Sequence, residues 1–340
     1  MILQRPGDVP EFLDGPGRSL PKGRKQLALA LHHLVLGSDA EVRRITEDLD
    51  PEAGVRAEEV QFIRGALGSS ASGSATDAAG ASPMILAAWL SRLARDAADH
   101  MAAGRTREAA LAYSDLLLAV LDAPWKTDRD LLQSWSEALM RAQAAYRWNP
   151  KADWPSITVR VERGDSLISV RKRAVDTHPE LLVCTGEIAR ANRLQGETIH
   201  PGDVLKIPTA HANVLVDLDA HWLLFRMDSE VVAAWEIGIG KSGSETIPGD
   251  YRAGEKTKEP MWFRQGQPPV PFGDPENPLG TRWIAWQLLD GRNSGLGFHG
   301  TSDPGSIGDD RSQGCVRMRK DAIEELYEIL PRGAVIRVRP

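Results

Sequence analysis

The hydrophobic period of this chain changes at Pro155, and that change constrains the fold more than any other feature. Before Pro155, apolar residues recur every three or four positions, which is the spacing of one face of a helix. After it, Val159 and Val161 alternate with polar residues, which is the spacing of a strand. One segment cannot satisfy both periods, so we expect a helical N-terminal part followed by strand-rich parts. A length of 340 residues is enough for two or three domains.

Residues 1–82 are predicted to hold a flexible arm, a helical segment and a linker. The arm is rich in Pro and Gly, and helical patterning follows from about Lys25 to Arg64 with a break at Asp50-Pro51. From Gly65 onward the chain is dominated by Gly, Ser and Ala and has no apolar period, which is typical of a linker.

The beginning of this segment has some features of a secretion signal. Basic residues up to Lys25 precede an apolar run at 27–36, but His32 and His33 interrupt the run and no clear cleavage site follows. We therefore favour an amphipathic helix here over a signal peptide. The chain has no run of about 18 apolar residues, so we expect no transmembrane helix.

Residues 83–150 are predicted to form an all-α region of three helices. Pro83 suits the first turn of the first helix, and Gly104 suits its end. Thr106 and Thr127 are candidate N-caps for the second and third helices. The first two helices resemble a tetratricopeptide-type hairpin, which would imply a site for a partner protein. A plain helical bundle explains the same pattern, because one hairpin does not establish a repeat array.

Residues 156–209 read as a small α+β module. A turn at Gly164-Asp165 follows the first strand, a helical stretch covers Glu187 to Asn192, and the segment Ile199–Pro208 closes the unit. These blocks resemble a LysM module, which implies a β-α-α-β fold and binding to the N-acetylglucosamine-containing glycan of peptidoglycan or chitin. The alternative is a spacer that binds nothing. We interpret Cys184, which lies in this module, as a packing residue.

Residues 211–340 are predicted to be mostly β, as an antiparallel sandwich or barrel. Alternating strands are expected at 214–218, 222–225, 231–237 and 335–338, and turns are expected at Asp219-Ala220, Asp228-Ser229, Gly238 and Gly240. Residues 250–282 contain many Gly and Pro residues and are expected to form long loops around a cleft. One late helix is expected, with Asp321 as its cap.

Cys315 and His299 are the candidate catalytic pair. A thiolate is a better nucleophile than a thiol, and a nearby imidazole can lower a cysteine pKa or take the thiol proton. Gly314 would let the backbone turn so that N–H groups face a developing oxyanion. On the pair alone, a buried structural cysteine is the simpler interpretation, because local Cys/His signals transfer weakly.

Several further blocks occur in order around this pair: Asn213–Leu218, Gly238–Lys241, Thr246–Gly249, Pro260 with Trp262, Asn277–Trp283, His299–Thr301 and Ser312–Arg317. With them, residues 211–340 resemble the catalytic domain of L,D-transpeptidases of the YkuD family. That family cleaves the bond between the third residue of a peptidoglycan stem tetrapeptide, usually diaminopimelate, and the terminal D-Ala. It then transfers the acyl group to an amine.

The resemblance implies that Cys315 attacks the carbonyl and that His299 moves the proton. The turn and oxyanion residues would be Ser312, Gln313 and Gly314, and the substrate-binding residues would be Trp262, Gly300, Thr301 and Arg317. Arg317 could bind a carboxylate, or it could make a structural salt bridge. The family commonly has His at the position of Gln313, and this departure leaves His299 as the candidate base within the motif.

Two other kinds of site, a serine nucleophile and a zinc centre, have weaker support in the sequence. Ser169–Lys172 fits a Ser-x-x-Lys pattern and Lys241–Gly243 resembles Lys-Thr-Gly, but the two patterns fall in different predicted modules. The histidines show no zinc-ligand spacing with either cysteine, so no metal and no cofactor is expected. An L,D-carboxypeptidase that uses water as acceptor, and a non-catalytic peptidoglycan-binding protein, stay open as alternatives.

The expected partner is peptidoglycan, through both its stem peptide and its glycan strand. A net charge of −6 gives no sign of nucleic-acid binding. Because peptidoglycan lies outside the cytoplasmic membrane, we expect the protein to act in the periplasm or cell wall, although no signal sequence is clearly encoded.

Overall fold

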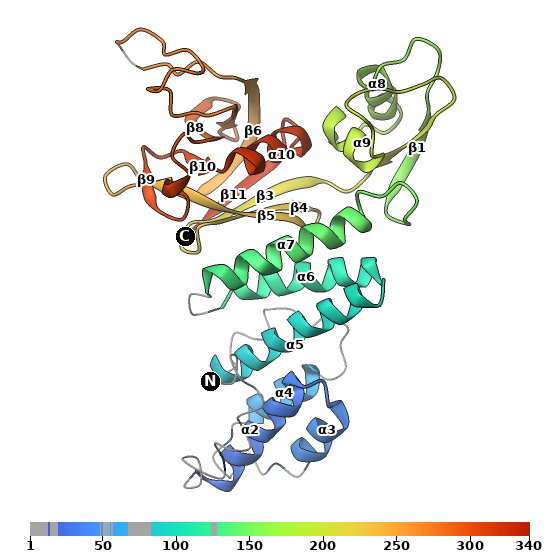
Figure 1. Ribbon diagram of the computed structural model, residues 1–340, viewed down its shortest axis with the longest axis vertical. Helices are drawn as coiled ribbons and strands as arrows, with labels where there is room; N and C mark the ends of the chain where they lie inside the picture. Colours follow the sequence, from blue (N-terminus) through green and yellow to red (C-terminus); the bar gives the residue numbers. More distant parts are fainter. Residues whose placement is uncertain are drawn as a thin grey trace. The chain divides into compact units, whose positions relative to one another are not determined.

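The computed structural model describes residues 13, 20–47, 49, 55, 57–66, 83–123, 128–264 and 266–340 (Figure 1). By the density of its contacts the chain divides into two units, residues 1–138 and residues 139–340. The predicted break at Asp50-Pro51, most of the predicted linker and the cap at Thr127 lie outside the described residues.

The first unit is helical, as predicted. Its helices are α2 (Lys22–Val35), α3 (Asp39–Glu47), α4 (Ala57–Ala66), α5 (Pro83–Ala102) and α6 (Thr106–Leu121), and α7 (Arg129–Ala145) crosses the boundary between the units. One extra break separates α2 from α3 at Gly37, whose φ of 71° suits glycine. Gly104, with the same φ, follows α5 as expected.

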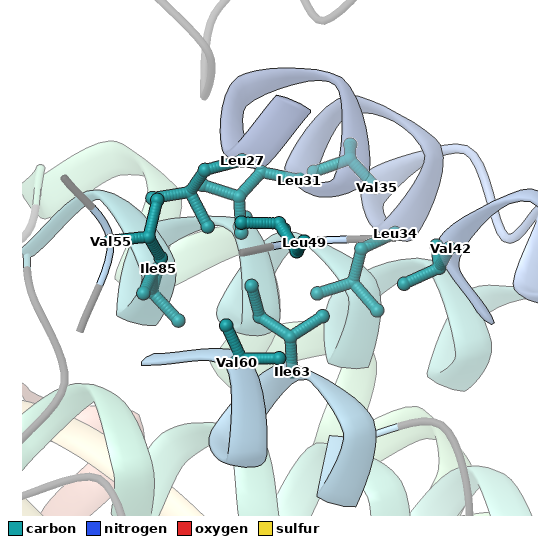
Figure 2. Close-up of a cluster of buried hydrophobic side chains, with 11 residues drawn as sticks. Leu27, Leu31, Leu34, Val35, Val42, Leu49, Val55, Val60, Ile63 and Ile85 are labelled. Atoms are coloured by element: carbon teal, nitrogen blue, oxygen red, sulfur yellow. The ribbon is translucent and has the colours of Figure 1, made fainter. Parts of the chain in front are cut away.

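The amphipathic interpretation of residues 27–36 is confirmed. Leu27, Leu31 and Leu34 of α2 are fully buried and pack in one cluster with residues of α4 and α5, among them Ile63 and Ile85 (Figure 2). Burying a leucine side chain stabilises a fold by about 1.5–3 kcal/mol, so this segment belongs to the core of the first unit.

The predicted cap at Thr106 differs from the structure. Thr106 is the first helical residue of α6, and Arg105 is its N-cap without a side-chain bond. At α7, the Asp128 carboxylate accepts a hydrogen bond from the Leu131 N–H at 3.1 Å. A carboxylate at this position satisfies a free N–H and complements the helix dipole.

A small unit of two strands and two helices opens the strand-rich part. Its elements are β1 (Ser156–Arg160), α8 (Leu167–Thr177), α9 (Thr185–Ala191) and β2 (Val204–Pro208), and β1 pairs antiparallel with β2. Ser166 caps α8 by accepting from the Ser169 N–H. The core of this unit contains Val161, Leu167, Val170, Ile188 and Ile207.

The remaining strands form one nine-stranded sheet: β3 (Ala212–Asp217), β4 (Trp222–Met227), β5 (Glu230–Gly240), β6 (Gly249–Lys258), β7 (Arg282–Gln287), β8 (Asn293–His299), β9 (Asp310–Ser312), β10 (Val316–Met318) and β11 (Val335–Arg339). The order is β10-β8-β7-β6-β11-β3-β4-β5-β9, and a further pairing of β10 with β5 closes it into a barrel. Of the predicted sandwich or barrel, the structure shows the barrel. It is not wholly antiparallel, because β10–β8, β11–β3 and β5–β9 are parallel pairs.

Gly238 and Gly240 are not turn residues. Both lie inside β5, where a Cβ on Gly238 would be 2.4 Å from the Ser306 carbonyl oxygen and one on Gly240 would be 2.2 Å from the Ser244 carbonyl oxygen. These glycines therefore allow other segments to approach the strand closely, a role that sequence alone does not separate from a turn.

Two further predictions in this part need correction. Residues 249–258 form strand β6, so the long loop begins only at Glu259; it extends away from the sheet between β6 and β7 (Figure 1, orange). Helix α10 (Lys320–Ile329) is preceded by Arg319 as N-cap, and Asp321 lies in its first turn instead.

Helix α9 packs closely on α10. A Cβ on Gly186 would be 2.0 Å from the Glu328 carbonyl oxygen, and the Cys184 Sγ lies 3.1 Å from the same oxygen. Burial raises the pKa of the Cys184 thiol to about 12, which agrees with a packing role. Burial also raises the pKa of Glu187 to about 8. One of its carboxylate oxygens accepts from the Cys184 N–H, and the other has no partner.

Candidate active site

Strand pairing brings Cys315 and His299 to the same face of the sheet. β8 and β10 run parallel, with Val316 opposite Phe298 and Arg317 opposite His299. Because side chains alternate along a strand, Cys315 and Arg317 share a face with His299. Val316 and Phe298 point the other way and are fully buried.

The turn before Cys315 is held by the hydroxyl of Ser312. The Ser312 Oγ accepts from the Gly314 N–H at 3.1 Å and donates to the Cys315 carbonyl at 2.5 Å. Gly314 has a φ of 106°, which an L side chain rarely adopts. The Gly314 N–H, predicted as an oxyanion donor, is therefore already engaged, and the Cys315 N–H is the better candidate.

Thr246 anchors this turn from a loop that is distant in sequence. Its buried hydroxyl donates to the Gly314 carbonyl at 2.9 Å and accepts from the Gly240 N–H at 3.0 Å. Sequence analysis placed Thr246 in a family block but assigned it no role, because its partner lies 68 positions away.

His299 is held in one orientation and one tautomer. Its Nδ1 lies 2.5 Å from the Gly300 carbonyl oxygen. Since a carbonyl can only accept, Nδ1 carries the proton and Nε2 has the free lone pair of a base. The ring also stacks on Trp283 of β7, with centroids 6.0 Å apart and planes at 25°. Trp283 was not among the predicted site residues.

Burial keeps both members of the pair neutral. The pKa of His299 is lowered to about 4, mainly by burial and also by the charge of Arg317, while the hydrogen bond to Gly300 acts in the opposite direction. Burial raises the pKa of Cys315, although the Gly297 N–H and Arg317 act in the opposite direction. The expectation of a thiolate stabilised at rest is therefore wrong for this structure, and thiol and imidazole face the cavity uncharged at neutral pH.

The guanidinium of Arg317 has no carboxylate partner in the described part of the chain. Its buried Nε has no hydrogen-bond partner, and across the described ranges no carboxylate forms an ion pair with it. The structural salt bridge considered above is therefore absent from the described part of the chain. A buried N–H without a partner costs free energy unless a ligand completes it.

The pair opens into a cavity of about 860 Å³. Of the predicted site residues, those that line it are Cys315, His299, Ser312, Gln313, Arg317 and Trp262. Gly314, Gly300 and Thr301 do not line it. Gly300 orients His299 and lies close to Gly280, and the Thr301 hydroxyl bonds with the backbone of Asp303.

The loop between β6 and β7 forms one wall of the cavity, and Asn277 holds that wall together. The buried Asn277 amide nitrogen donates to the carbonyls of Pro260, Val270 and Pro271 at 2.9–3.1 Å, and its oxygen accepts from the Leu279 N–H. This role was not predicted, although Asn277 begins one of the family blocks.

The part of the chain that contains this cavity is similar to known proteins. Residues 212–338 match the family model of the L,D-transpeptidase (YkuD) catalytic domain. YqjB of Bacillus subtilis strain 168, a candidate L,D-transpeptidase, is 31% identical over 140 residues, which are 41% of this chain and 72% of YqjB. The chain belongs to the L,D-transpeptidase (YkuD) family.

The chain is also similar to one further curated protein and to solved structures. The candidate L,D-transpeptidase YkuD of the same strain is 26% identical over 188 residues, covering 54% of this chain and 98% of the relative. An L,D-transpeptidase from Mycobacterium smegmatis is 24% identical, covers 41% of this chain and 64% of that chain, and has a TM-score of 0.32. The catalytic domain of the Enterococcus faecium L,D-transpeptidase acylated by ertapenem is 21% identical. The match covers 38% of this chain and 98% of that domain, with a TM-score of 0.31.

Members of the YkuD family are cysteine-dependent acyltransferases. Membership of this family implies a peptidoglycan substrate, which lies in the cell wall outside the cytoplasm. No helix in the described part of the chain is long and apolar enough to cross a bilayer. The described residues also contain no cluster of three or more side chains suited to hold a metal ion.

Proposed function

We propose that this protein is a peptidoglycan L,D-transpeptidase in which Cys315 is the nucleophile and His299 is the base. The observation that carries the proposal is that one cavity is lined by both side chains, with the imidazole Nε2 free to accept a proton. The stem-peptide donor, the D-Ala leaving group and the amine acceptor come from the family resemblance.

The neutral pair implies that proton transfer accompanies the attack. The Cys315 Sγ attacks the carbonyl of the third stem residue as its proton moves to His299 Nε2. The oxyanion is held by the Cys315 N–H, an interaction worth about 3 kcal/mol per good donor. Collapse expels D-Ala, which takes the proton from His299 and leaves a thioester on Cys315. An amine then attacks the thioester, and the sulfur regains a proton.

The unpaired guanidinium of Arg317 supports a role in donor binding. Arg317 lines the cavity beside the pair and has no carboxylate partner within the described part of the chain. A substrate carboxylate would complete its hydrogen bonds, because the planar fork of arginine matches that group.

Incubation with disaccharide-tetrapeptide, followed by mass spectrometry, tests the proposal. A cross-linked dimer supports transfer, a tripeptide product supports the carboxypeptidase alternative, and no product supports the non-catalytic alternative. Cys315→Ala should form no acyl-enzyme, and His299→Ala should acylate about 10²- to 10⁴-fold more slowly. An adduct on the Cys315→Ala protein would refute the assignment of the nucleophile.

We also propose that residues 156–209 form a LysM-like glycan-binding module ahead of a catalytic domain at 211–340. The order β1-α8-α9-β2 supports this assignment. A variant that lacks residues 157–208 should bind isolated sacculi more weakly and still turn over a soluble stem peptide. Equal sacculus binding would refute the glycan-binding role.

The α5–α6 hairpin within residues 83–150 is proposed as a site for a protein partner, and residues 1–82 as its N-terminal extension. The site of action is proposed to be the periplasm or cell wall, where peptidoglycan lies. Fractionation of cells that express the full chain tests the location. Recovery in the cytoplasmic fraction alone would contradict it.

A further inference from the structure

Glu259 stands out because its backbone is strained next to the catalytic cavity. Its φ is 48°, in the left-handed region that non-glycine residues rarely adopt. The next residue is Pro260, which adds a further restriction on the residue before it. Such strain persists only where the surrounding structure enforces it, and it is concentrated at functional sites.

Two contacts enforce this conformation. The Glu259 N–H donates to the Thr281 carbonyl at 2.9 Å, and the Pro260 carbonyl accepts from the buried Asn277 amide at 2.9 Å. Both contacts join the end of β6 to the segment just before β7. These contacts therefore hold the backbone of Glu259 in one conformation at the rim of the cavity.

Glu259 is an exposed residue that lines the cavity. Thr257 and Glu259 line the cavity, whereas Lys258 between them pairs with Glu328 at 3.2 Å. Within the described ranges no side-chain cation pairs with the Glu259 carboxylate. Glu276, the other carboxylate on the wall, is 3.5 Å from Arg264.

We propose that Glu259 selects the acyl acceptor by binding a cationic amine before it attacks the thioester. This proposal rests on the proposed function, since it concerns the second half of the same reaction. An unpaired carboxylate at the rim raises the local concentration of ammonium groups and favours them over water. Glu259 is therefore a specificity residue for transfer over hydrolysis.

The bound ammonium first loses one proton to water, because His299, with a pKa of about 4, is a weaker base than the amine. The neutral amine then attacks the thioester carbonyl carbon, and its second proton passes to His299 Nε2 and on to the sulfur. The C–N bond forms, the C–S bond breaks, and the sulfur leaves as thiol. The products are the amide, free Cys315 and one released proton, and no other reactant is needed.

The test uses the full-length protein, a tetrapeptide donor and two acceptors. Glycinamide is mostly cationic at neutral pH, and hydroxylamine is mostly neutral. For Glu259→Gln we expect the KM for glycinamide to rise about three- to tenfold, as for loss of one partly solvated charge pair. The KM for hydroxylamine and the rate of acyl-enzyme formation should not change, and more tripeptide should appear at low glycinamide.

Glu276→Gln is the matched control, because it removes a carboxylate from the same wall that already has a cation partner, and it should leave every value unchanged. Added salt should raise the KM for glycinamide in the original protein towards that of Glu259→Gln.

An equal effect on both acceptors, no effect, or the same effect from Glu276→Gln would overturn the inference while acyl-enzyme formation stays normal. Absence of any acyl-enzyme in the original protein would overturn the proposed function and this inference together.

Discussion

Acylation of Cys315 should be insensitive to pH across the range in which histidines usually titrate. His299 acts as a base only when it is neutral, and burial lowers its pKa to about 4. A lowered pKa means that the imidazole loses its proton at lower pH, so the neutral base persists into acid conditions. The perturbation is a change of pH from 7.5 to 5.5 with the protein otherwise unaltered.

The size of the effect separates two mechanisms. With a pKa near 4, about 97% of His299 is neutral at pH 5.5, so the acylation rate should change by only a few per cent. An unperturbed histidine, with a pKa near 6.5, would be only about 9% neutral at pH 5.5, and the rate would fall about tenfold. The rate should begin to fall only below about pH 5.

Stopped-flow measurement of acylation by ertapenem, which acylates the E. faecium catalytic domain, gives this rate without a contribution from the acceptor step. Thermal melting at each pH provides the control for unfolding. A tenfold fall with a midpoint near 6.5 would refute the neutral, buried base. A rise in rate from pH 7.5 to 9 would refute the raised pKa of the Cys315 thiol, because it would report thiolate formation.

Three further predictions concern residues that hold the site and the core. Thr246→Val removes the hydroxyl that bonds Gly314 and Gly240, so it should lower the free energy of unfolding by about 1–3 kcal/mol in urea and slow acylation. Glu187→Gln should raise the melting temperature at pH 8–9 but not near pH 4. The folded-state pKa of Glu187 is raised to about 8, so the native protein loses stability as pH rises from the unfolded value towards 8. Gly186→Ala should lower the melting temperature, because its Cβ would lie 2.0 Å from a carbonyl oxygen of α10.

Matched variants test the reasoning behind these three. Thr158→Val changes an exposed threonine on β1 and should leave stability and acylation unchanged. Glu197→Gln changes an exposed carboxylate of the same module and should not alter the pH dependence of melting. Equal effects from Thr158→Val and Thr246→Val, or a pH profile that Glu187→Gln leaves intact, would contradict the roles assigned here. An unchanged melting temperature for Gly186→Ala would contradict the close packing of α9 on α10.

Much of the fold could be predicted from local pattern. The helical period before Pro155 and the strand alternation after it correspond to the helices and strands observed, because side-chain periodicity is a local property. The predictions that Thr106 and Asp321 are N-caps were wrong. Several neighbouring residues can stand at the start of a helix, and tertiary contacts determine which one does. The prediction that Gly238 and Gly240 are turn residues was wrong for a different reason. Sequence shows that a glycine is present but not which distant backbone approaches it.

Only some residues of the candidate site could be predicted from the sequence. Cys315, His299 and the turn residues around Gly314 lie close together in the chain, so their motif could be found without a structure. Thr246, Asn277 and Trp283 act on that motif through contacts that close only when the barrel forms. Gly300 and Thr301 adjoin the motif in sequence but follow the end of β8 and do not line the cavity, since Gly300 packs against Gly280 and the Thr301 hydroxyl bonds with the backbone of Asp303.

By itself, the sequence determined the change from helical to strand-rich parts, the presence of the Cys315 and His299 motif, and the resemblance to a transpeptidase family. Only the tertiary structure decided that the pair is neutral at rest, that Ser312 occupies the Gly314 N–H, and that Glu259 is held strained and unpaired at the cavity. The physical reason is that protonation state, hydrogen-bond availability and strain depend on burial and on partners brought together by folding. Motif spacing depends only on the chain.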